Sequence, residues 1–245
     1  MTFHDHTSSG GMLWQKILFI AVVVSIFIVS KVSSRYSPGA ARKRRDGLSA
    51  LAQRLNLTFS PDNDYGLVRQ FDFLKPFAQG MDRYAYNLLS GNYRGYDVRA
   101  FDYHYEGERK NKNSRSMEYR FSVLILLLPV SCPDLTIRPE NFFRKAAEKL
   151  GGEDIQFESA EFSKAFRVRC VEKKFAYDIC NPRMMEYLLA NRDLSIEIQY
   201  QVVALVFDSF VSFNACLPVD KIEYNLNRLA QIRSLMPDYL FTQNA

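Results

Sequence analysis

Three residues whose side chains can bind metals or exchange protons alternate along one predicted strand. Asp102, His104 and Glu106 occupy every second position, which in an extended strand places their side chains on one face, about 7 Å apart. A carboxylate, an imidazole and a second carboxylate could hold a divalent metal or act as acid and base. The competing interpretation is a solvated polar face, which is ordinary on a half-exposed sheet. Arg120 favours that interpretation, because we expect it opposite Asp102, where a cation opposes metal binding.

A second group of charges lies at the predicted hairpin tip that follows this strand. Its cations could contact phosphate groups, although Glu106 and Glu108 lie beside them, and a solvated turn is the competing interpretation. The four cations are Arg109, Lys110, Lys112 and Arg115.

Other catalytic signals are missing from the sequence. His104 is the one histidine after residue 6, which argues against Ser-His and Cys-His hydrolases. Phosphate-binding GxxxxGK, dinucleotide-binding GxGxxG and nucleophile GxSxG motifs do not occur. The four cysteines are widely spaced without a CxxC pair, which disfavours zinc. We therefore expect no cofactor and favour a function other than catalysis. The cysteines are Cys132, Cys170, Cys180 and Cys216.

Two neighbouring strands, predicted over residues 96–106 and 117–128, position the polar residues. Aromatic and charged residues alternate on both strands, so an antiparallel register can match charge with charge and ring with ring. A slip of one residue would set aromatic side chains against charges. The predicted pairs are Asp102 with Arg120, His104 with Glu118, Phe101 with Phe121 and Tyr103 with Tyr119.

The remaining pattern predicts an α+β fold. A further strand is expected over 84–89, with a turn at 90–92. Apolar residues recur at helical spacing over 48–55 and 220–236. We expect antiparallel strands that curve into a sheet or small sandwich, closed by this C-terminal amphipathic helix.

The segment 12–32 is predicted to be a transmembrane helix. Its centre, 17–30, carries no charge, and 21 residues in a helix span about 30 Å. Lys16 and Lys31 can extend their ammonium groups to the two interfaces, and Trp14 fits an interfacial anchor. A cleaved signal peptide and a buried or interfacial helix remain as alternatives, although a signal peptide carries its cations before the apolar core.

The cations near this segment predict its orientation. Six Lys or Arg and no acid lie between residues 31 and 45, so the positive-inside rule places the C-terminal part in the cytoplasm of a bacterial cell, at the inner membrane. Reduced cysteines are then expected, whereas disulfides become feasible if the domain lies outside. The predicted organisation is an external tail (1–11), the transmembrane helix (12–32), a basic juxtamembrane linker (33–47) and an α+β domain (48–245).

The basic residues are concentrated beside the membrane. Seven of the 32 cations, but one of the 27 acids, precede residue 46, so the domain itself is close to neutral. This distribution argues against nucleic-acid binding. Arg42, Lys43, Arg44 and Arg45 could bind anionic lipid headgroups or serve only as a topology signal.

Four short motifs resemble those of a family of uncharacterised bacterial proteins with one membrane span and a cytoplasmic α+β domain. In that family an aromatic PheAspTyr-x-Tyr strand leads to a polar hairpin and an apolar strand. The resemblance implies a membrane-anchored protein and supplies no catalytic residues. The matching segments are 87–95, 101–105, 137–140 and 162–166.

Together these features predict a membrane-anchored protein that presents an interaction domain in the cytoplasm. Its expected partners are the bilayer through 12–32, anionic headgroups, and an unidentified protein. The alternative is a membrane-associated, metal-dependent enzyme that uses Asp102, His104 and Glu106. A scaffold that oligomerises through its span is a third hypothesis, disfavoured because residues 12–32 contain no GxxxG.

Overall fold

The computed structural model describes residues 38–74, 77–78, 80–107, 116–140, 154–206 and 215–242. The predicted tail and span (1–32) and the cations of the hairpin tip lie outside these ranges. Contacts between Cα atoms divide the chain into two compact units, Met1–Gly47 and Leu48–Ala245. None of the helices in the described ranges has the length and apolar character needed to cross a membrane.

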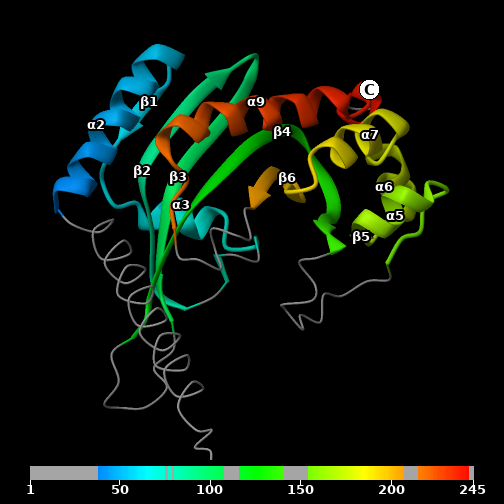
Figure 1. The fold of residues 1–245 in the computed structure, drawn as a ribbon, viewed down its shortest axis with the longest axis horizontal. Coiled ribbons are helices and arrows are strands. Elements are labelled where there is room, and N and C mark those ends of the chain that lie inside the picture. Colours follow the sequence, from blue (N-terminus) through cyan, green and yellow to red (C-terminus); the bar gives the residue numbers. More distant parts are fainter. Residues whose placement is uncertain are drawn as a thin grey trace, which may run out of the picture. The chain divides into compact units, whose positions relative to one another are not determined.

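Six antiparallel strands form one sheet in the larger unit, so the α+β class is confirmed (Figure 1). Their order is β1-β2-β3-β4-β5, and β6 pairs with β4. The strands are β1 (Thr58–Ser60), β2 (Met81–Tyr93), β3 (Tyr96–Glu106), β4 (Glu118–Pro139), β5 (Phe166–Cys170) and β6 (Ser195–Val206).

Strand β4 is the centre of this sheet. It pairs with β3 through its first half and with β5 through its last five residues, while β6 runs along its opposite edge. We predicted a break after residue 128, but the strand continues to Pro139. Pro129 and Pro133 are accommodated because the β4–β6 register is irregular between Leu127 and Leu135, and prolines within sheets occur at such irregularities.

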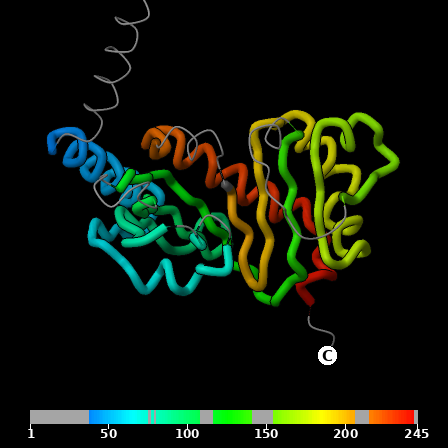
Figure 2. The backbone as a smooth tube through the Cα atoms, turned by 90° about the horizontal axis from the view of Figure 1, so that it is seen from below, coloured from blue at the N-terminus to red at the C-terminus, as the bar shows by residue number. Residues whose placement is uncertain are grey.

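Helices cover both faces of the sheet (Figures 1 and 2). Helix α3 (Tyr65–Gln70) packs in a smaller core with Phe101, Tyr103 and Phe121. On the other face a larger core gathers Leu124 and Leu126 of β4 with residues of the remaining helices. These are α2 (Pro38–Leu55), α5 (Ala160–Ala165), α6 (Lys173–Ile179), α7 (Pro182–Ala190) and α9 (Val219–Leu235), with the short η2 (Asp238–Leu240) at the end. The predicted C-terminal helix is therefore present and buries one face.

The predicted start of the first helix and the predicted position of the first hairpin turn were both wrong. Helix α2 begins at Pro38 rather than at residue 48, so much of the predicted linker is helical. Proline suits the first position of a helix, and the alanines, arginines and lysine that follow are strong helix formers. The turn predicted at 90–92 lies instead at Arg94 and Gly95, which both have positive φ, as a two-residue hairpin loop requires.

The predicted β3–β4 register was wrong by two residues. The strands are antiparallel as expected, but Asp102 lies opposite Ser122 and His104 opposite Arg120. Because the shift is even, each side chain keeps its face, and Tyr103 pairs with Phe121 instead of Tyr119.

Candidate functional site

The four predicted headgroup-binding residues lie on the first half of α2. Arg42, Lys43 and Arg45 are exposed and Arg44 is half-buried. Successive residues of an α-helix are rotated by about 100°, so four in a row cover most of its circumference. The buried residues of α2 start only at Leu48. This part of the helix therefore presents a cationic surface.

Two of the three residues on the predicted polar face of β3 are buried and the third, Glu106, is half-buried, so its interpretation as a solvated surface was wrong. Asp102 is 2% exposed and His104 3% exposed. Asp102 accepts hydrogen bonds from Asn87 Nδ2 at 2.9 Å and from Ser122 Oγ at 2.7 Å. Ser122 Oγ in turn accepts from the Leu217 backbone N at 2.9 Å. The carboxylate thus joins β2, β3 and β4 to the segment that leads into α9.

The three residues of the metal hypothesis have separate partners. His104 stacks on Tyr84, with ring centroids 4.5 Å apart, and its Nδ1 lies 3.2 Å from the Asp82 carbonyl oxygen. Glu106 accepts a hydrogen bond from Ser116 Oγ at 2.6 Å. Within the described ranges, no group of three or more His, Cys, Asp or Glu side chains is arranged to hold a metal ion. The described geometry therefore gives the metal-dependent alternative no support.

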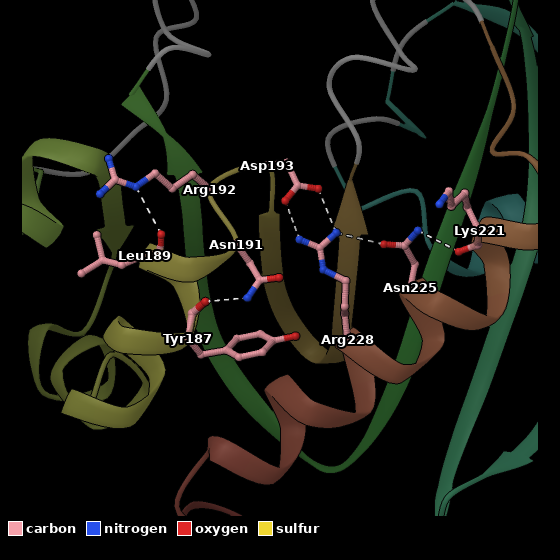
Figure 3. Close-up of polar contacts among 8 residues, drawn as sticks. All are labelled: Tyr187, Leu189, Asn191, Arg192, Asp193, Lys221, Asn225 and Arg228. Carbon is pink, nitrogen blue, oxygen red and sulfur yellow. Dashed lines mark hydrogen bonds and ion pairs between the residues drawn. The ribbon is translucent and has the colours of Figure 1, made fainter.

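A buried guanidinium links α9 to the loop before β6 (Figure 3). Arg228 is 5% exposed, and its Nη1 and Nη2 donate to the two carboxylate oxygens of Asp193 at 2.8 and 2.6 Å. Nη1 also donates to Asn225 Oδ1 at 3.2 Å. These hydrogen bonds lower the pKa of Asp193, whereas burial raises the pKa of the neighbouring Tyr187. The two-oxygen geometry is the strong form of this pair and fixes α9 in place.

A cavity of about 320 Å³ was not predicted. Strands β4, β5 and β6 form its floor, where Thr136 lies directly between Arg169 and Glu197 in the cross-strand register. Asp134, Gln199 and Phe73 also line it. Alternation along each strand could have assigned these side chains to one face, but the adjacency of the three strands is not visible in the sequence.

Comparison with solved structures shows a likeness to one protein. The crystal structure of the mycobacterial trehalose monomycolate transport factor A, TtfA, aligns with a TM-score of 0.49 at 13% sequence identity, covering 82% of this chain and 98% of that chain. No protein-family model matches the sequence. A search of curated proteins also gives no match.

Proposed function

We propose that this chain is a single-span protein of a bacterial inner membrane whose α+β domain acts as an interaction module in the cytoplasm. Support comes from the uncharged run at 17–30 and the cations that follow it, because cytoplasmic flanks of membrane helices are enriched in Lys and Arg. The near-neutral domain favours a protein partner over nucleic acid.

The observation that carries the proposal is the cationic surface of α2. Arg42, Lys43 and Arg45 are exposed on a regular helix that follows the predicted span within a few residues. Each cation near an anionic membrane surface contributes about 1 kcal/mol. We propose that residues 42–45 bind anionic headgroups and so hold the start of α2 at the membrane surface.

Lipid nanodiscs allow this contact to be tested on the full-length chain. Trp14 is the single tryptophan, so Ala41→Trp in a Trp14→Phe background gives one fluorophore beside the cations. We expect a headgroup-attached spin label to quench it more strongly in phosphatidylglycerol than in phosphatidylcholine discs. Glutamine at all four positions 42–45 preserves helix propensity and should abolish the difference. Equal quenching in both lipids would mean that residues 42–45 act only as a topology signal.

The cytoplasmic location is tested separately. Reporters that are active on one side of the membrane, fused after Ala245, should give a cytoplasmic signal. An external signal would overturn the proposed orientation and reopen the signal-peptide interpretation. Crosslinking of the full-length chain in cells then tests for a protein partner of the domain, with the fusion result defining the compartment in which to look.

A further inference from the structure

The cavity on β4, β5 and β6 is large enough to hold a small organic group. Residues of the larger core alternate along these strands with the polar residues that line the cavity, so the lining faces away from α9 and its neighbouring helices. Its volume of about 320 Å³ falls at the lower end of the range for small-ligand sites.

One aromatic ring lines the cavity and a second packs against it. Phe73 lines the cavity, and Tyr200 packs against it edge to face, with ring centroids 4.9 Å apart. The Tyr200 side chain is nevertheless 54% exposed. Its φ of 50° lies in the left-handed region, which tyrosine rarely adopts. This conformation occurs opposite Cys132, where the β4–β6 register is irregular, and such irregularities re-aim side chains.

The charges of the lining favour a cation. Glu197 is 3% exposed and forms an ion pair with Arg138 at 3.9 Å, whereas Asp134 is exposed. Arg169 is the lining residue of opposite charge, and its Nε already donates to Asp154 at 2.6 Å. Arg138 offsets the charge of Glu197 as Asp154 offsets that of Arg169, so the carboxylate of Asp134 leaves the lining with a net negative charge. Carboxylates together with aromatic rings are the groups that bind organic cations.

We propose that this cavity binds an alkylammonium or guanidinium group, placed against Phe73 and Tyr200 with Asp134 as its counter-charge. Such a group comes either from a lysine or arginine side chain of a partner protein or from a free aliphatic amine. The proposal uses none of the cations of α2, and its test does not depend on the membrane proposal.

Methyl NMR of the full-length protein in nanodiscs gives a direct readout, because Thr136 and Val171 both line the cavity. We expect n-butylammonium to shift their methyl signals saturably, and 1-butanol, its neutral analogue, to leave them unchanged. Equal shifts from the two probes, or shifts that do not saturate, would overturn the proposal.

Variants assign the interaction to named side chains. Asp134→Asn keeps an acceptor for Gln199, whose Nε2 donates to Asp134 at 3.1 Å, and should weaken butylammonium binding at least tenfold. Tyr200→Asn removes the ring while suiting a positive φ, and should do the same. Tyr239→Asn, at a tyrosine of similar exposure in η2, should bind like wild type. Unchanged affinity in Asp134→Asn would refute the assignment.

A lysine peptide distinguishes the two sources of the cation. If acetyl-Gly-Lys-Gly-amide binds at least tenfold more tightly than n-butylammonium, the occupant is a side chain of a partner protein. Tighter binding of the free amine identifies a small molecule. Failure of both probes to bind overturns the proposal and leaves the headgroup result on α2 untouched.

Discussion

Ser122 and Asp102 form a 2.7 Å hydrogen bond inside the sheet, between directly paired residues of β4 and β3. The same Ser122 oxygen accepts from the backbone N of Leu217. One hydroxyl therefore satisfies both a buried carboxylate and a buried backbone donor. A buried polar group that loses its hydrogen-bond partner destabilises the fold. The pair therefore fixes the position of the segment before α9.

Replacement of Ser122 by alanine should destabilise the fold by about 1–3 kcal/mol, because it leaves an acceptor and a donor buried without this link. Denaturant unfolding of the purified chain in detergent measures the change. Ser234→Ala is the matched control, since that hydroxyl is exposed and donates within its own helix, to the Gln231 carbonyl. Its effect should stay within about 0.5 kcal/mol, and an equal loss in both variants would contradict the role of Ser122.

The β3–β4 register shows what alternation in the sequence can and cannot determine. Period-two patterning assigns each side chain to a face, and the faces of Phe101, Tyr103 and Asp102 were predicted correctly. It does not distinguish registers that differ by two residues. The choice depends on hydrogen bonds from distant residues, here from Asn87 and Leu217 to Asp102 and Ser122, which a local pattern cannot reveal.

Short helices, and sites formed by residues that are far apart in the sequence, were harder to predict. Helices α5 and α6 have six and seven residues, too few for a helical period to emerge. The cations of α2 are contiguous in sequence, so they could be identified directly. The cavity is lined by Phe73, Asp134, Arg169 and Glu197, which come from four segments that are far apart in the sequence.

Loss of the hydroxyl group should have opposite effects on the stability of the fold at two buried tyrosines, Tyr103 and Tyr93. No described residue forms a hydrogen bond with the buried Tyr103 hydroxyl, and burial raises its pKa. Tyr103→Phe should therefore be neutral or stabilise the fold by up to about 1 kcal/mol. Tyr93 donates to Asn227 Oδ1 at 2.8 Å, so Tyr93→Phe should destabilise it by about 1 kcal/mol.

Paired thermal and denaturant unfolding of the two tyrosine variants measures this contrast. Each substitution removes a single oxygen from an aromatic ring, so the variants are controls for each other. A clear destabilisation by Tyr103→Phe would show that its hydroxyl has a partner, and would contradict the prediction.

The Arg228–Asp193 pair should make stability depend on acid pH. Hydrogen bonds from Arg228 lower the pKa of Asp193 in the folded state below its unfolded value of about 3.9. The unfolded chain then binds more protons near this pH, so stability rises with pH. The contribution is complete above about pH 5 and is lost as the pH falls through the folded pKa.

Urea unfolding of wild type and Arg228→Met between about pH 2.5 and 7 isolates this contribution. Methionine removes the cation and leaves a mostly exposed Asp193 carboxylate. The difference in unfolding free energy should be largest at neutral pH and should shrink toward acid pH. A difference that is constant with pH would mean that Arg228 stabilises α9 by packing alone.

The four cysteines should differ in reactivity. None of them is in a disulfide; Cys132, Cys170 and Cys180 are buried and Cys216 is half-buried. Burial raises the pKa of Cys132 to about 11 and also raises those of Cys170 and Cys180. Because the thiolate is the reactive form, these three thiols should react slowly with maleimide at pH 8.

Timed maleimide labelling with peptide mass spectrometry should therefore identify Cys216 as the first thiol modified in the native protein, ahead of the others by at least about tenfold in rate, in line with the low thiolate fraction of a thiol with a pKa near 11. All four should react after denaturation, which controls for local sequence. Cys216→Ser should leave the native protein nearly unlabelled on the same time scale. Rapid labelling of Cys132 or Cys180 in that variant would show that the larger core opens readily, since both residues pack within it.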